Sequence, residues 1–417
     1  MRWLGLLTLL LPGGAGLLWA ADAKEPVEVP VKGFLVHEWG VFRVHDDVEL
    51  ANADARAEWD GLPKFVYGQT TMRDFPHRLE QLRPIYKPVI FLHAPKAMAV
   101  TVRVDFSRGV PAVWWPATWY PAHEAQAFQR VPATPEKPAR HLVWRLELKQ
   151  PLAVGGAPSE RKPLGNAHWM QALRDVKCDE VYVALGDRTL AMEQEHFVYY
   201  DGLLRGVQAL SISTEKGRAT LKNEAKFPVS DVWVVDRRDV EKARVGRLPR
   251  LDAGETKDVE LPVMNEARWV GDAEKSLTAE LKGAGLNEDE AASLTAIWSE
   301  GFFRGAGLTL LYRLPQEEYD RLLPLTVKPR PEKVVRVGLV QQVPVDQEMA
   351  ERVARLVKQL DDDAFDKREA AQRELENLGR AAYAPLRRLQ PTIFAPEPKR
   401  RLDEVLEKLD AERAIRK

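Results

Sequence analysis

Alternating apolar and polar positions dominate the chain between residues 31 and 262. In AVTVRVDF, residues 99–106, every second residue is apolar, which is the period of a half-buried strand. HLVWRLEL, residues 141–148, repeats this pattern. Further short runs follow with Pro, Gly or charged residues between them, and no helical pattern regularly intervenes. The region is therefore predicted to form antiparallel sheets, most simply a sandwich.

A helical pattern interrupts the strands between residues 272 and 300. Leu277 and Leu281 share one face of a predicted helix. Asn287, with Glu290 three residues later, has the form of a capping box that begins a second helix. Because strand-like runs then return, we expect a helical hairpin inserted into the β-rich region or packed on it.

Helical spacing governs the chain after residue 345. Apolar residues recur there at intervals of three and four, beginning with Met349, Val353, Leu356 and Leu360. The chain is thus predicted to have an α+β fold in two parts. A mainly antiparallel, sandwich-like β domain would occupy residues 24–345, and a small helical bundle residues 346–417. The exposed helices of this bundle are candidates for contact with a protein partner.

The first 23 residues have the pattern of a secretory signal peptide. Arg2 supplies a positive charge, an apolar run follows, and the sequence ADA ending at Ala23 has the small-x-small form of a signal-peptidase site. The sequence PGG at residues 12–14 breaks the apolar run, which is barely as long as a spanning helix requires. We expect cleavage after Ala23, an exported protein that is periplasmic or extracellular, and no integral membrane segment in the mature chain.

Composition limits the classes of partner. Cys178 is the only cysteine, so the fold must be held together by its core, and 417 residues with 45% hydrophobic composition suffice for that. The chain has 61 basic and 62 acidic residues. This balance gives no net field that would attract nucleic acid or an anionic membrane, so we expect neither as a partner.

Two stretches are similar to known protein groups. GFLVHEWGVF, residues 33–42, together with SEGFFRGAGLTLLYRLPQEEYDRLLPLTVKP, residues 299–329, resembles uncharacterised exported bacterial proteins of the planctomycete type that share an HEWG-x-F motif. The resemblance extends over residues 33–340 and implies no particular activity. LDDDAFDKREAAQRELENLGRAAYAPLRRL, residues 360–389, resembles a single HEAT-like helical unit. Because repeat arrays need at least three units to bury a continuous core, one unit does not predict a long solenoid.

His37 and Glu38 are the first candidates for a ligand-binding site. If residues 34–42 form one strand, these two side chains point to opposite faces, and both faces are otherwise apolar. One metal ion is then not expected to bind both, unless a bulge near Gly40 turns one of them. A carboxylate among apolar neighbours must be paired, hydrogen-bonded or protonated. A structural ion pair is the favoured interpretation of Glu38 over a functional group, and His37 is predicted to be a hydrogen-bonded interior histidine.

A second candidate is the aromatic stretch VWWPATWYPAH, residues 113–123. Trp114, Trp119 and Tyr120 lie in or beside a proline-containing loop and would form a platform for sugar rings, which makes a glycan a candidate ligand. Alternatively, these large aromatics fill the core, and strand alternation would send Trp114 and Trp115 to opposite faces. The eight histidines are scattered, without HExxH, HxH or a cysteine pair, so neither a metal site nor a cofactor is predicted.

Two classes of function remain. The first is a non-catalytic binding or scaffolding protein of the cell envelope, which is favoured because no catalytic motif has the required spacing. The second is a hydrolase, acting on polysaccharide, that would use Glu38 or the pair Glu193 and Glu195, which share one face of a predicted strand. Otherwise, Glu193 and Glu195 are expected on the solvated side of an edge strand. The sequence identifies no catalytic residue.

Overall fold

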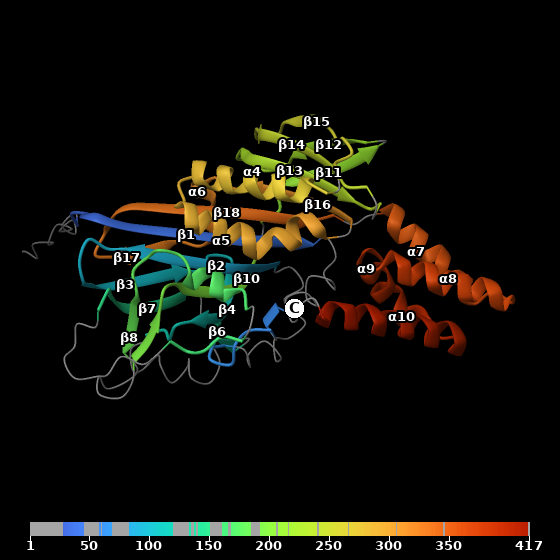
Figure 1. Cartoon of the computed structure of the whole chain (residues 1–417), viewed down its shortest axis with the longest axis horizontal. Helices are drawn as coiled ribbons and strands as arrows, with labels where there is room; N and C mark the ends of the chain where they lie inside the picture. Colours follow the sequence, from blue (N-terminus) through green and yellow to red (C-terminus); the bar gives the residue numbers. More distant parts are fainter. Residues whose placement is uncertain are drawn as a thin grey trace, which may run out of the picture.

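The computed structural model describes most of the chain. The described residues are 28–45, 58–59, 61–68, 83–119, 133–134, 137–138, 141–150, 161–165, 168–184, 192–205, 207–215, 217–239, 242–265, 267–305, 307–344 and 347–415. The predicted signal peptide and Tyr120 lie outside them. The described part confirms the predicted α+β class, with mostly antiparallel sheets and helices at the C-terminus (Figure 1).

An eight-stranded sheet forms the centre of the β domain. Its strands lie in the order β14-β13-β16-β18-β1-β2-β10-β4. Their bounds in that order are Arg244–Leu251, Val229–Arg237, Gly307–Arg313, Pro331–Val343, Val31–His45, Arg83–His93, Val198–Leu204 and Gly109–Trp115. Neighbouring strands are antiparallel except β1 and β18, which are parallel. The strand that carries the HEWG motif therefore lies inside the sheet, paired on both sides.

Strand β1 buries both of its faces. Phe34, Val36 and Phe42 belong to one hydrophobic cluster, whereas Trp39 and Val41 belong to another, and none of the five is more than 1% exposed. This division follows the period of two along a strand. A run of apolar residues without polar alternation is typical of such a doubly covered strand.

Two smaller sheets cover one face of the central sheet. One has the order β17-β3-β7-β8-β9, with bounds Leu325–Lys328, Met98–Asp105, His141–Leu148, Val181–Ala184 and Met192–Glu195. The other has the order β11-β12-β15, with bounds Leu210–Glu215, Arg218–Asn223 and Thr256–Glu260. Their apolar residues join Phe34 and Val36 in one core, which confirms the predicted sandwich-like packing.

Helices cover the opposite face of the central sheet (Figure 1). They are α3 (Met170–Arg174), α4 (Trp269–Gly283), α5 (Glu288–Ser299) and the π-helical turn η3 (Glu300–Arg304). Leu277 and Leu281 of α4 are buried against this face with Trp39, and the predicted capping box of Asn287 and Glu290 is present. The inserted helical hairpin is therefore confirmed.

Three short elements complete the β domain. Helix α6 (Gln316–Leu322) lies between β16 and β17 in sequence, and β5 (Ala133–Thr134) pairs with β6 (Lys137–Pro138). Tyr319 of α6 is fully buried and belongs to the same core as Phe34. Helix α6 therefore closes part of the face that the smaller sheets cover.

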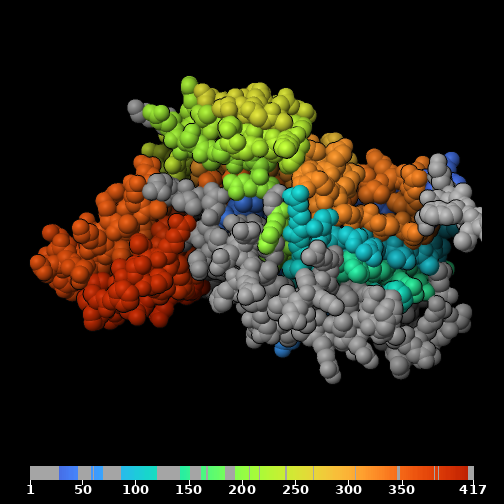
Figure 2. All heavy atoms as spheres, turned by 180° about the vertical axis from the view of Figure 1, so that it is seen from behind, coloured from blue at the N-terminus to red at the C-terminus, as the bar shows by residue number. Residues whose placement is uncertain are grey.

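The C-terminal helices pack around a core of their own. They are α7 (Gln347–Gln359), α8 (Phe365–Leu378), α9 (Arg380–Leu389), the 3-10 turn η4 (Gln390–Thr392) and α10 (Pro396–Ile415). Val353, Leu360, Leu375 and Leu402 are buried in that core. Figure 2 shows these helices, in orange and red, as a lobe at one end of the molecule. Among the described helices, none has the length and apolar character that crossing a bilayer requires.

Candidate functional site

Glu38 is the centre of a buried ion-pair network on the sandwich face of β1. The parallel register of β1 and β18 sets Glu38 directly beside Arg336. Arg336 Nε lies 2.6 Å from Glu38 Oε2, and both side chains are 0% exposed. The hydroxyls of Tyr200 and Tyr319 donate to Glu38 Oε1, the latter at 3.2 Å. Both carboxylate oxygens are therefore already bound by groups of the same chain.

The electrostatics of this network favour the ion pair. Burial disfavours the charged form of Arg336, but the carboxylate of Glu38, Tyr319 and Tyr200 together outweigh burial and raise the pKa of the guanidinium. Burial and the same carboxylate raise the pKa values of Tyr200 and Tyr319, so both hydroxyls remain donors. Arg336 also donates to the Leu323 carbonyl at 2.7 Å. This arrangement is the structural ion pair that the sequence favoured for Glu38.

His37 points to the helix-covered face, opposite to Glu38. Its Nδ1 lies 2.8 Å from Glu290 Oε2, and His93 Nε2 lies 2.8 Å from Glu290 Oε1. His37 is 3% exposed and Glu290 is 0% exposed. His37 pairs with Phe91 across the antiparallel strands, so His93, two residues along, is its diagonal neighbour on the same face. Three polar side chains from β1, β2 and α5 thus converge; we call them the His37–His93–Glu290 cluster.

Glu290 is held as a carboxylate. Burial opposes its ionisation, but the hydrogen bonds from His37 and His93 and from the backbone N–H of Asn287 outweigh burial and lower the pKa of Glu290 to about 2. The N–H of Asn287 donates to Glu290 Oε2 at 2.8 Å, which is part of the capping box. The cap that begins α5 therefore also fixes the carboxylate between the two imidazoles.

Sequence reasoning identified His37 but missed its partners. His93 is the last residue of β2, and Glu290 was interpreted only as a helix cap. The antiparallel register of β1 and β2 would have located His93, and the packing of α5 on the sheet would have located Glu290, but no local pattern specifies either.

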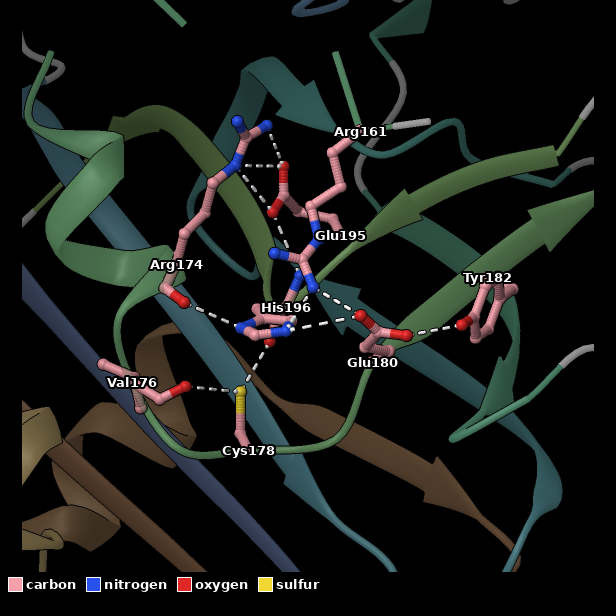
Figure 3. Close-up of polar contacts among 8 residues, drawn as sticks. All are labelled: Arg161, Arg174, Val176, Cys178, Glu180, Tyr182, Glu195 and His196. Carbon is pink, nitrogen blue, oxygen red and sulfur yellow. Dashed lines mark hydrogen bonds and ion pairs between the residues drawn. The ribbon is translucent and has the colours of Figure 1, made fainter. Parts of the chain in front are cut away.

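A second buried ion pair joins Glu195 of β9 to Arg174 of α3 (Figure 3). Arg174 Nη2 lies 2.6 Å from Oε2, and Arg174 Nε lies 3.0 Å from Oε1, so the guanidinium binds both oxygens. Trp115 Nε1 and the backbone N–H of His196 also donate to the carboxylate, at 3.2 and 3.0 Å. Glu195 is 0% exposed, so the prediction that it lies on the solvated side of an edge strand is wrong. The cause is α3, whose arginine reaches the edge strand.

Cys178 and His196 adjoin this ion pair without forming a nucleophile–base pair. His196 Nδ1 lies 2.8 Å from the Arg174 carbonyl oxygen, and Cys178 Sγ donates to the His196 carbonyl at 2.9 Å (Figure 3). Burial, followed by the charges of nearby carboxylates including Glu290, raises the pKa of Cys178. Because the thiolate is the reactive form, Cys178 is not an activated nucleophile.

Glu193 is also buried, contrary to expectation. It is 4% exposed, the Tyr67 hydroxyl donates to its Oε1 at 2.5 Å, and the Ala117 N–H donates to its Oε2 at 2.7 Å. Burial raises the pKa of Glu193, although these hydrogen bonds oppose the shift. Glu193 and Glu195 thus differ in environment, because only Glu195 has a buried arginine partner.

A third buried charge cluster, which the sequence does not indicate, lies where β2 meets β10. Lys87 has a φ of 52°, in the left-handed region, at a register shift between β1 and β2. Its backbone N–H donates to Asp201 Oδ1 at 2.5 Å, and Trp59 Nε1 donates to Asp201 Oδ2 at 3.1 Å. Asp201, which is 0% exposed, therefore holds Lys87 in its left-handed backbone conformation.

The Lys87 ammonium lies between two aromatic rings. Its Nζ is 4.8 Å from the centre of the Trp169 ring and 4.6 Å from that of Trp298, and it also pairs with Glu58. Burial lowers the pKa of Lys87 to about 7, against the opposing charge of Asp201. Burial also raises the pKa of Asp201 to about 7. The charges of this pair therefore change near neutral pH.

The predicted aromatic platform is mostly core. Trp114 is 5% exposed and Trp115 is 1% exposed, and they belong to the two different clusters on opposite sheet faces. Trp119 is 37% exposed, but the guanidinium carbon of Arg145 lies 3.3 Å from the centre of its ring. Tyr120 lies outside the described residues. Of the candidate sugar-binding rings with described positions, Trp119 alone reaches solvent appreciably, and Arg145 lies over its ring.

Comparison with known proteins adds little to these observations. No protein-family model matches the chain, and no curated protein matches it. Among solved structures, the chain is similar to a yeast delta-COP-I mu-homology domain complexed with a Dsl1 WxWxV peptide, with 7% sequence identity and a TM-score of 0.25. The match covers 75% of this chain and 98% of that chain. At this TM-score the likeness supports no conclusion about fold or function.

Proposed function

We propose that the mature chain is an exported cell-envelope protein, periplasmic or extracellular, that binds a partner and catalyses no reaction. One observation carries this proposal: two of the three carboxylates named for hydrolysis are held in buried ion pairs. Arg336 binds Glu38, and Arg174 binds Glu195, each at 2.6 Å. A glycosidase needs two carboxyl groups that reach the same sugar in a cleft. Glu38 and Glu195 instead have their oxygens bound by the protein itself.

The C-terminal helices supply the surface that we propose for a protein partner. Phe365, the first residue of α8, is 55% exposed, and Phe394, two residues before α10, is 85% exposed. Large aromatic side chains are enriched among the residues that contribute most to protein–protein binding. The balanced charge of these helices agrees with a protein partner rather than with nucleic acid.

The alternative proposal, a hydrolase acting on polysaccharide, has one observation in its favour. Burial raises the pKa of Glu193, whereas Glu195 two residues away is ion-paired, and a pair of carboxyl groups in different environments can divide the acid and base roles. Against it, both side chains are buried and accept hydrogen bonds from the same chain. A glycan remains a candidate ligand through Trp119.

Export is tested separately from binding. Mass spectrometry of the native protein should show an N-terminus at Lys24 or within a few residues of it. An intact Met1 on a membrane-bound form would contradict the proposed export.

Binding is tested with two surface variants of the full-length protein. Native envelope extracts are passed over immobilised wild type, Phe394→Asp and Val263→Asp, and the recovered proteins are quantified by mass spectrometry. Val263 is a matched control, because it is an apolar residue that is 50% exposed outside the helices. We expect Phe394→Asp to lose proteins that the wild type and Val263→Asp retain. Equal recovery by all three contradicts the helical docking surface.

The proposal that the protein catalyses no reaction is tested by a separate measurement. Wild type and Glu193→Gln are incubated with polysaccharide from the native envelope, and the release of reducing ends is measured. We expect no release by either protein. Release by the wild type that Glu193→Gln abolishes would establish the hydrolase instead.

A further inference from the structure

The His37–His93–Glu290 cluster has the composition and spacing of a metal site. One donor atom from each side chain, two imidazole nitrogens and a carboxylate oxygen, lies within 4.8 Å of the others. These are the donors that bind zinc and related transition metals, and two histidines with one glutamate form a known three-ligand zinc set that leaves a fourth position open. We propose that His37, His93 and Glu290 bind a divalent transition-metal ion of the zinc type. This inference goes beyond the proposed function and does not depend on it.

The three ligands come from elements that hold them rigidly. His37 and His93 are diagonal neighbours on paired strands, and Glu290 projects from the first turn of α5. The two imidazole rings have centroids 5.1 Å apart and planes inclined at 59°, so they approach the carboxylate from different directions instead of stacking. Convergence from different directions is what tetrahedral coordination needs.

The carboxylate has the supporting contact that metal ligands have in proteins. The N–H of Asn287 donates to Glu290 Oε2 at 2.8 Å and thereby fixes the orientation of the carboxylate. Hydrogen bonds of this kind orient ligands and raise metal affinity. Glu290 is 0% exposed, and a buried negative charge is costly unless a positive charge balances it. A bound metal ion would supply that positive charge.

The hydrogen-bonded form of the cluster is close to the metal-bound form. The nitrogen–oxygen separations are 2.8 Å in the structure. Tetrahedral zinc with ligands at about 2.0–2.1 Å requires ligand atoms about 3.3 Å apart. These two separations, each to a different oxygen of Glu290, must therefore widen by about 0.5 Å when the shared hydrogens are replaced by the ion. The other separations among the three donor atoms are at most 4.8 Å and must settle near the same value of about 3.3 Å. The His93 side chain is 19% exposed and that of His37 is 4% exposed, so an ion would enter past His93.

The test uses the untagged full-length protein after dialysis against a chelator. Zinc chloride is titrated in by isothermal calorimetry, and the thermal midpoint is measured with and without zinc. We expect one zinc ion per chain and a higher midpoint in its presence, because a ligand that binds only the folded state stabilises it. Co²⁺ replaces Zn²⁺ in a parallel titration, and its visible absorption should report tetrahedral coordination.

Three variants separate this site from adventitious binding. His93→Ala removes the most exposed ligand, and Glu290→Gln keeps the size of the side chain while removing its charge. His141→Ala, a partly buried histidine at the start of β7, is the matched control. We expect His93→Ala and Glu290→Gln each to weaken zinc binding by about 100-fold or more, given that even the residues that orient zinc ligands contribute about 10–100-fold. His141→Ala should bind as the wild type does.

Two results would overturn the proposal. One is the absence of stoichiometric zinc binding by the wild type. The other is binding that His93→Ala and Glu290→Gln leave unchanged while their far-UV circular dichroism shows folded protein. In either case the His37–His93–Glu290 cluster serves only to link β1, β2 and α5 by hydrogen bonds.

Discussion

At residue 38, a carboxylate forms an ion pair with a guanidinium, and both side chains are 0% exposed. Glu38→Ala would remove the only fully buried ion-pair partner of Arg336 among the described residues and leave its guanidinium paired with Asp320, whose side chain is 47% exposed. Breaking one side of a buried ion pair costs about 3–5 kcal/mol when the remaining charge is uncompensated, and a half-exposed partner such as Asp320 compensates Arg336 only in part. We therefore expect Glu38→Ala to lower the free energy of unfolding by about that amount, measured by urea denaturation.

An exposed ion pair provides the control for this prediction. Glu260 pairs with Arg218 on the three-stranded sheet, where the two side chains are 72% and 56% exposed. Solvent screens such pairs, so Glu260→Ala should unfold almost as the wild type does. If Glu38→Ala instead keeps wild-type stability and loses a ligand or an activity, the carboxylate is functional.

The Lys87–Asp201 pair should make stability depend on pH. Asp201 has a folded-state pKa raised from 3.8 to about 7, so between these values the folded chain binds more protons and stability falls as pH rises. Lys87 has a folded-state pKa lowered from 10.5 to about 7, so above pH 7 the unfolded chain binds more protons and stability rises with pH. The contribution of the pair is therefore smallest near pH 7.

The double variant Lys87→Met/Asp201→Asn isolates this effect from other titrating groups. We expect the difference in unfolding free energy, wild type minus variant, to grow by about 2 kcal/mol on moving from pH 7 to pH 5 or pH 9. Urea denaturation at the three pH values measures it. A difference that is largest at pH 7 would show a stable ion pair and would contradict the expected protonation states.

At the scale of elements, local patterns identified strands but not their partners. The alternation in residues 99–106 and 141–148 predicted β3 and β7, which pair antiparallel as expected. The run at residues 34–42, apolar on both faces of the predicted strand, likewise lies in a strand that is covered on both faces. The alternation along a strand reflects which side chains of that one segment are buried. It can therefore be recognised in the sequence of the segment itself.

The candidate sites depend on pairings that no local pattern specifies. Arg336 follows Glu38 by 298 positions, and Glu290 follows His37 by 253. The parallel register of β1 and β18 makes the first contact, and the packing of α5 on the sheet makes the second. Sequence reasoning could therefore establish that Glu38 needs a partner, but not which residue that partner is.

Close packing explains why the HEWG motif ends in glycine. A Cβ at Gly40 would lie 2.8 Å from the Tyr319 hydroxyl and 3.2 Å from Pro88 Cα. Gly40→Ala should therefore push α6 or β2 away from β1 and lower the free energy of unfolding by about 1–3 kcal/mol, measured by urea denaturation. Gly283→Ala, at the end of α4, is the control, since its Cβ would meet nothing within 4 Å and alanine favours helix. Equal stability of both variants would contradict this explanation of Gly40.

At the scale of the whole molecule, we expect the C-terminal helices and the β domain to be two units that fold separately. The C-terminal helices have their own buried core, distinct from the two cores of the β domain. Between the units, Arg238 and Glu348 form an ion pair of 3.8 Å, in which the Glu348 side chain is 89% exposed. Such a pair contributes little to stability. The β domain should therefore fold without the helices.

Tryptophan fluorescence can follow the β domain alone. All twelve tryptophans lie at or before position 298, so none is in the C-terminal helices. The most direct test compares the urea unfolding of residues 24–344 with that of residues 24–417 by tryptophan fluorescence. We predict one cooperative transition in both, with the same midpoint and slope, because no strand and no buried apolar residue of the β domain is removed. Aggregation of the shorter chain, or a clearly lower midpoint, would show that the helices complete the β core and would contradict a separable docking unit.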